Sequence, residues 1–186
     1  LTRLMTGSEG TLGIIVEMML RLLPLPEEVR TMTAVFNDMR SAAETVSLVI
    51  KRGIIPRTIE FMDKNSIRCV ERTLESSLPD GAAAMLLLEV DGSPAENREA
   101  LIRLEQVCIE KGAIDIDRAE DKAAAERLWR ARKAISPALY TFGPDKINED
   151  IVVPRNRIPD MVEKIRQIGE ATGLVTASFG HAGDGN

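Results

Sequence analysis

The single histidine of the chain lies in a segment whose residues could take up a proton or bind a metal. His181 belongs to the sequence SFGHAGDGN, residues 178–186, where it follows an apolar run. A neutral imidazole there can serve as a base or hold a divalent metal, with Asp184 and Asn186 nearby in the turn. One histidine and one aspartate do not fill a coordination sphere. The residues alone leave open a base, a metal ligand, or a histidine that only closes a strand.

A second segment, ERLWRARKAISPALY at residues 126–140, combines positive charges with an apolar stripe at helical spacing. Such a charge run is usually the solvated face of a helix. Arg132 is different because it borders the apolar stripe, where a guanidinium could form a fork with a substrate carboxylate. Turn and cap chemistry accounts for the polar cluster Asn148, Glu149 and Asp150.

The glycine-rich sequence GSEGTLG, residues 7–13, could bring the backbone close to a ligand. Its glycines allow N–H groups to point at an anion. It is not a Walker loop, because it lacks Gly-Lys-Ser/Thr, and it is not a Rossmann fingerprint, because no helix is expected after it. A loop that contacts a cofactor and a plain tight turn both remain open.

The composition restricts the class of protein. Of the 186 residues, 44% are hydrophobic and 28% are charged, as in ordinary globular proteins. The net charge of -5 argues against a nucleic-acid partner, and no apolar run is long enough for a transmembrane segment. Cys69 and Cys108 lie on apolar, helix-like stretches and are expected to be buried free thiols. These features favour a cytoplasmic location.

The elements that must position these residues alternate along the chain. Residues 10–26 are expected to form a strand that ends in a proline linker. After them, strands are expected at 31–37, 57–63, 82–92, 113–119 and 174–181, a loop followed by a strand within 145–154, and helices at 39–52, 64–74, 93–112, 120–139 and 159–172. This order predicts an α+β fold: a ferredoxin-like antiparallel sheet with helices packed on one face, preceded by a strand or arm.

The order of the segments resembles the FAD-linked oxidases of the vanillyl-alcohol oxidase type. GSEGTLGIIVEMMLRLLPLPE is similar to the last segment of their FAD-binding domain, and LWRARKAISPAL, NEDIVVP and FGHAGDGN are similar to signatures of their C-terminal domain. Within this family, the chain resembles the FAD subunit of glycolate oxidase and D-lactate dehydrogenase. The resemblance implies two parts: residues 1–28 as the last segment of the FAD-binding domain, and residues 29–186 as the oxidase C-terminal domain, truncated at its active-site motif.

The resemblance also implies roles for individual residues. Arg132 would bind the substrate carboxylate, with the hydroxyl of Ser136 one turn later. His181 would be a base or a ligand of a divalent metal such as zinc. Some relatives carry a lysine at the position of Asn148, whereas Lys146 lies two residues earlier here. FAD would be lined by Gly7, Ser8, Glu9, Gly10, Thr11, Gly13, Ile14 and Asn186, and Asn186 would also contact the substrate.

The activity implied by the resemblance is the oxidation of a 2-hydroxy acid, of the glycolate or D-lactate type, by hydride transfer to FAD. The missing FAD-binding domain and electron-transfer subunits would be partners, and the latter could associate the protein with a membrane. The isolated chain is expected to be inactive and free of flavin. Two alternatives stay open: a non-catalytic ferredoxin-like module that binds a small molecule or a partner, and a homodimer that exchanges the N-terminal arm.

Overall fold

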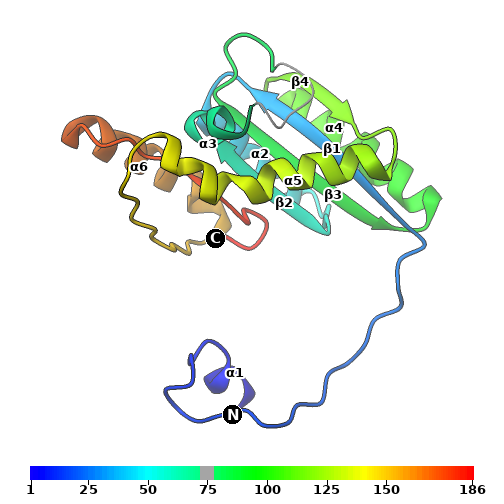
Figure 1. Ribbon diagram of the computed structural model, residues 1–186. Helices are drawn as coiled ribbons and strands as arrows, with labels where there is room; N and C mark the ends of the chain where they lie inside the picture. Colours follow the sequence, from blue (N-terminus) through cyan, green and yellow to red (C-terminus); the bar gives the residue numbers. More distant parts are fainter. Residues whose placement is uncertain (72–77) are drawn as a thin grey trace.

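The computed structural model describes residues 1–71 and 78–186, which form one sheet, its helices and an extended N-terminal segment (Figure 1). Within these residues the sheet has five antiparallel strands in the order β4-β1-β3-β2-β5. The strands are β1 (Glu28–Phe36), β2 (Thr58–Asp63), β3 (Ala84–Gly92), β4 (Ala113–Arg118) and β5 (Phe179–Gly180). The helices are α1 (Thr2–Met5), α2 (Met39–Lys51), α3 (Lys64–Val70), α4 (Pro94–Glu110), α5 (Lys122–Ala138) and α6 (Ile158–Thr172). The predicted α+β class with an antiparallel sheet is confirmed.

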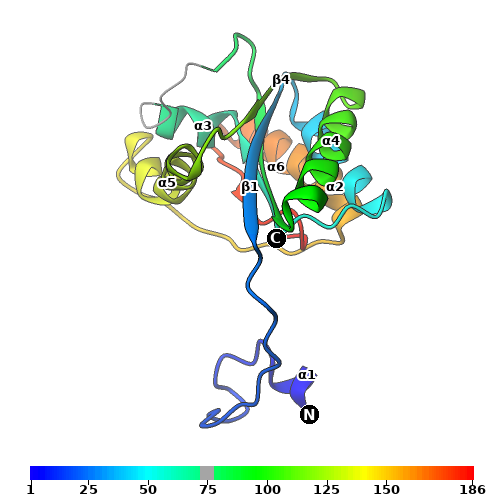
Figure 2. The same ribbon diagram turned by 90° about the vertical axis from the view of Figure 1, so that its right-hand side faces the viewer.

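Helices cover both faces of the sheet, whereas the sequence pattern predicted helices on one face only. Figure 2 shows α2, α4 and α6 on one side of β1 and α3 and α5 on the other. Both faces can be covered because successive residues of the central strands are apolar. Ala34 and Leu86 join the core beneath α2 and α4, while Val35 and Leu87 join the core beneath α3 and α5. The second face matters most for function, because α5 carries the arginine singled out above.

Local sequence signals set the helix ends. The Asp38 side chain caps α2 by accepting a hydrogen bond from the Ser41 amide, and Ser93 and Glu96 form a reciprocal capping box at the start of α4. Gly173 ends α6 in the left-handed conformation that glycine adopts most readily. The helix expected at 64–74 is observed as α3, and its residues 72–74 lie outside the described part of the chain.

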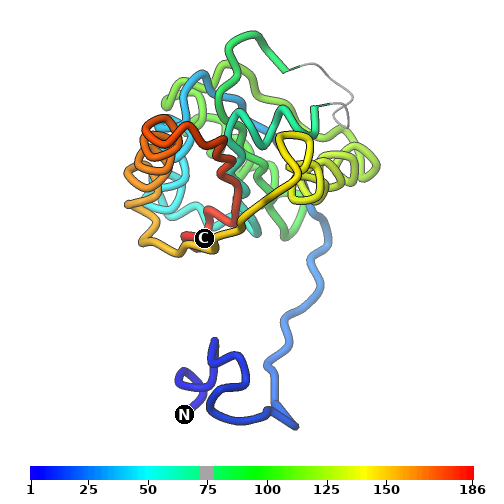
Figure 3. Tube along the Cα trace, turned by 60° about the vertical axis from the view of Figure 1, so that its left-hand side comes forward, coloured from blue at the N-terminus to red at the C-terminus, as the bar shows by residue number. Residues whose placement is uncertain are grey.

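Residues 1–27, which we call the arm, leave the body at the start of β1 (Figure 3). The strand expected within 10–26 is not formed, because none of the strands in the described residues lies beside it to supply the backbone hydrogen bonds that it would need. Its apolar side chains face solvent, with Ile14 87% and Leu25 93% exposed. Figures 1 and 2 place the C-terminus on the side of the body from which the arm leaves.

Two further strands differ from the expectation. The strand expected after the loop within residues 145–154 is not formed, although the Val153 amide donates to the Gly185 carbonyl. Of residues 174–181, only β5 pairs as a ladder with β2. None of the helices in the described residues is both long and apolar enough to cross a bilayer.

Candidate functional site

Two of the residues singled out in the sequence meet on one buried carboxylate. Arg132 donates from Nε and from Nη2 to Oε2 of Glu60, each at 2.8 Å. Nδ1 of His181 lies 2.5 Å from Oε1 of the same carboxylate. The Glu60 side chain is 1% exposed, compared with 12% for Arg132 and 65% for His181. These three residues, which we call the Glu60 cluster, connect β2, α5 and the C-terminal end of the chain.

Helix α5 is fixed against the sheet on both sides of Arg132. Ala131 and Ile135 are buried in the core on this face, so their spacing turns Arg132 toward β2. One turn earlier, Nε1 of Trp129 donates to Oε2 of Glu89 at 2.8 Å. Glu89 is a second buried carboxylate on the same face and lies on β3. Side chains of α5 therefore form hydrogen bonds with two buried carboxylates of the sheet, and only Glu60 also contacts the histidine.

The tail, residues 181–186, is anchored by backbone hydrogen bonds. The Gly183 amide donates to the Ile59 carbonyl at 3.2 Å, and the Val153 amide donates to the Gly185 carbonyl at 2.9 Å. Gly185 has a φ of +98°, and a Cβ atom at this position would overlap the Val153 carbonyl. Gly185 thus allows the close approach to Val153, and the Gly183 amide holds the tail against β2, which places the histidine beside Glu60.

The Arg132 guanidinium has one edge occupied and one edge open. Its Nε and Nη2 atoms face Glu60, and its carbon lies 4.9 Å from the centre of the Phe179 ring. Within residues 1–71 and 78–186, Nη1 makes no hydrogen bond or ion pair. The edge formed by Nη1 and the second hydrogen of Nη2 can therefore donate two parallel hydrogen bonds to a carboxylate.

Ser136 and Asn186 lie next to the Glu60 cluster. Ser136 is one turn after Arg132 on α5, and its Oγ and carbonyl oxygen each accept a hydrogen bond from Nζ of Lys146 at 2.9 Å. The Asn186 amide donates to the His181 carbonyl at 3.3 Å. Asn148, where some relatives carry a lysine, is exposed, whereas Lys146 reaches α5. The ammonium group thus adds a positive charge near the end of α5.

The glycine-rich loop is not brought to this site. Gly7, Glu9 and Gly10 have φ values of 77°, 48° and 77° and lie exposed in the arm, which stands clear of the body in Figures 1, 2 and 3. Two amides are used within the loop itself, because Ser8 donates to the Met5 carbonyl and Thr11 donates to the Ser8 carbonyl. The predicted role of Gly7, Ser8, Glu9, Gly10, Thr11, Gly13 and Ile14 stays a prediction.

The side chains do not fit the metal that the resemblance implied. The described residues contain no group of three or more His, Cys, Asp or Glu side chains that could hold a metal ion. Nδ1 of His181 already faces Glu60, so this histidine has one nitrogen left. A single nitrogen cannot hold zinc against water. A zinc site is not supported.

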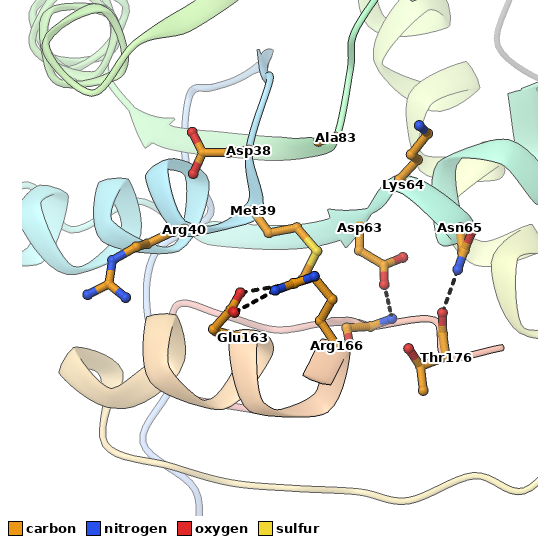
Figure 4. A pocket seen from close by; sticks show the side chains of 11 residues that line it. Asp38, Met39, Arg40, Asp63, Lys64, Asn65, Ala83, Glu163, Arg166 and Thr176 are labelled. Carbon is orange, nitrogen blue, oxygen red and sulfur yellow. Dashed lines mark hydrogen bonds and ion pairs between the residues drawn. The ribbon is translucent and has the colours of Figure 1, made fainter. Parts of the chain in front are cut away.

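A pocket of about 370 Å³ lies between α2, α3 and α6 and contains none of the Glu60 cluster (Figure 4). Several of its polar groups have partners: Asp63 accepts from the amides of Ser66 and Ser178, and Arg166 forms a two-point ion pair with Glu163. Burial raises the pKa of Asp63 above its usual value despite these donors. Among the lining residues, the Lys64 ammonium forms no hydrogen bond or ion pair with the described part of the chain.

Sequence reasoning missed Glu60. It lies between Ile59 and Phe61 in the sequence TIEFMD, where period-two alternation alone would turn an acidic side chain toward water. The available signal was an acidic residue flanked by apolar residues in an expected core strand. Only the position of α5 over this face shows that the carboxylate is buried.

Comparison with known proteins agrees with the geometry. The profile of the family "FAD linked oxidases, C-terminal domain" matches residues 25–186. The glycolate oxidase subunit GlcD of Bacillus subtilis (strain 168) is 39% identical over 186 residues, which is 100% of this chain and 40% of the relative. The D-lactate dehydrogenase of Anaerostipes hadrus is 32% identical over 193 residues, covering 100% of this chain and 41% of the relative.

Solved structures show the same fold. The 4-ethylphenol oxidase from Gulosibacter chungangensis superposes with a TM-score of 0.61 at 13% identity, covering 86% of this chain and 38% of the oxidase. The chain thus spans about two fifths of the length of its relatives. Because the profile matches almost the whole body and the GlcD match extends along the full chain, this chain belongs to the family of FAD-linked oxidases, as their C-terminal domain.

Proposed function

We propose that the chain provides the substrate-binding wall of a flavoprotein that oxidises a 2-hydroxy acid. The observation that carries this proposal is the Glu60 cluster: one buried carboxylate holds an arginine with an open edge next to a histidine with an open nitrogen. A 2-hydroxy acid has the matching pair of groups, a carboxylate and a hydroxyl on the adjacent carbon. The relatives named as glycolate oxidase and D-lactate dehydrogenase agree with this substrate class.

In the proposed reaction, the outer edge of Arg132 binds the substrate carboxylate and so fixes the orientation of the α-carbon. The hydroxyl then lies toward Nε2 of His181, and the O–H bond breaks as an Nε2–H bond forms. Ser136, one turn after Arg132 on α5, is the further residue of this helix that would contact the substrate. When bound, FAD supplies the acceptor for the α-hydrogen and its electron pair. The product is the 2-oxo acid.

The arm supports the same proposal. Its glycine-rich loop and exposed apolar residues form no part of the core, as expected of the last segment of an FAD-binding domain. Under this proposal, Gly7 to Ile14 and Asn186 line the flavin, residues 1–28 complete the FAD-binding domain and residues 29–186 hold the substrate. Electron-transfer subunits would reoxidise the flavin, and the cytoplasmic location stays a prediction.

The test uses the full-length flavoprotein and two matched substitutions on α5. Arg132→Lys keeps the charge beside Glu60 but loses the two-point fork, so KM for the 2-hydroxy acid should rise by about 10- to 100-fold. Arg130→Lys changes an exposed arginine of the same helix and should leave KM unchanged. His181→Gln should lower kcat by about 10²- to 10⁴-fold, as expected for the loss of a base. Equal KM values for the two arginine variants would contradict the proposed carboxylate site.

A further inference from the structure

Glu60 is a buried carboxylate that takes no direct part in the proposed reaction. A carboxylate removed from water is costly unless it is paired and hydrogen-bonded. Here Oε2 accepts two hydrogen bonds from Arg132, which alone would pair the charge, yet Oε1 is directed at His181. The contact between Oε1 and Nδ1 of His181 is therefore not required to neutralise Glu60, and it joins a buried residue to an exposed one.

We infer that Glu60 is a positioning residue: it holds His181 as the tautomer whose Nδ1 carries the hydrogen, which leaves the lone pair on Nε2. A carboxylate oxygen accepts hydrogen bonds and cannot donate one. Nδ1 at 2.5 Å from Oε1 must therefore be the donor, and in the neutral ring Nε2 is then unprotonated. This inference rests on the proposed function, which uses Nε2 as the base.

Glu60→Gln is a sharp test because the amide has one acceptor and one donor end. Arg132 can only donate, so the glutamine oxygen must face Arg132 and its NH₂ group must face His181. Nδ1 must then accept a hydrogen bond, and the ring proton moves to Nε2. The substitution keeps the shape of the side chain but reverses the tautomer. Loss of the lone pair at Nε2 should lower kcat of the full-length flavoprotein by about 10²- to 10⁴-fold and change KM much less.

The tautomer can be measured directly because the chain has one histidine. Long-range ¹H–¹⁵N correlation spectra distinguish the protonated ring nitrogen from the unprotonated one. Spectra of the 186-residue chain should be recorded near pH 9.5, well above the pKa of about 6.5 of a free imidazole. The wild-type chain should show Nδ1–H and the Glu60→Gln chain should show Nε2–H. The matched control is Glu89→Gln, which alters the second buried carboxylate on this face and should leave the His181 tautomer unchanged.

The outcomes separate this inference from the proposed function. A wild-type chain with the Nε2–H tautomer overturns the inference, even if the Glu60→Gln chain does not fold. The same holds if the Glu60→Gln chain folds and retains Nδ1–H. A reversed tautomer with unchanged kcat would leave Glu60 as the positioning residue but refute His181 as the base. Reversal together with a lowered kcat supports both.

Discussion

The pairing of Arg132 with Glu60 makes a quantitative prediction about stability. Arg132→Met keeps most of the side-chain volume but leaves the Glu60 carboxylate, 1% exposed, without its charged partner. Removing one member of a buried ion pair costs about 3–5 kcal/mol. His181 still bonds to Oε1, so the lower end of that range applies, and the free energy of unfolding should fall by about 3 kcal/mol. For a domain of this size, the fall corresponds to a decrease in Tm of about 6–12 °C.

Urea unfolding of the chain, followed by circular dichroism, measures this change. The informative comparison is the double variant Glu60→Met with Arg132→Met, in which neither charge remains and an apolar pair fills the space. It should recover most of the lost stability, because replacing a whole buried ion pair by apolar side chains is about neutral. Arg130→Met, an exposed position of the same helix, should change stability by no more than about 0.5 kcal/mol.

Two results would refute the reasoning. A loss of under about 1 kcal/mol in Arg132→Met would be typical of a surface pair and would mean that water reaches Glu60. A double variant as unstable as the single one would mean that the arginine acts through packing rather than through its charge.

Further predictions concern buried groups and the tail. Burial raises the pKa of Asp63, so the folded state binds the carboxyl proton more tightly than the unfolded state does. The stability contributed by this proton is fully present below the unfolded pKa of about 3.9 and is lost as the pH rises through the folded pKa. Asp63→Asn should remove that part of the pH dependence of the free energy of unfolding, measured with urea. Burial raises the pKa of the Cys108 thiol to about 12, so mass spectrometry should find Cys108 unmodified by iodoacetamide near pH 8 until the chain is unfolded. Gly185→Ala should destabilise the docked tail by about 1–3 kcal/mol and change the His181 resonances, because a Cβ would overlap the Val153 carbonyl; unchanged resonances would contradict the anchoring of the histidine by the tail.

The helices and inner strands could be predicted because local and long-range signals agree there. The cap at Asp38, the capping box at Ser93 and the left-handed Gly173 each mark a helix end through chemistry contained in a few residues. The helices of both faces could not be assigned to their faces in this way. Strands such as β3, apolar on both sides, are compatible with one covered face or with two.

The site was predictable only in part. Arg132 and His181 could be picked out as types of residue in suggestive positions, but nothing local relates positions 60, 132 and 181 to one another. Their meeting depends on α5 crossing β2 and on the tail lying at the edge of the same strand. Strand formation at 10–26 and 145–154 failed as a prediction for a related reason: an alternating or β-branched pattern needs a neighbouring strand, and sequence patterns do not reveal whether one is present.

Trp129 gives the molecule an optical signal at the place where function is proposed. It is the only tryptophan of the chain, and its indole N–H donates to the buried carboxylate of Glu89 one turn before Arg132. An indole held in this way should change its emission when α5 separates from the sheet, so fluorescence would follow the docking of one helix without any label. The rate at which an acid anion, a partner domain or a denaturant acts on that helix could then be measured from the fluorescence of Trp129 alone.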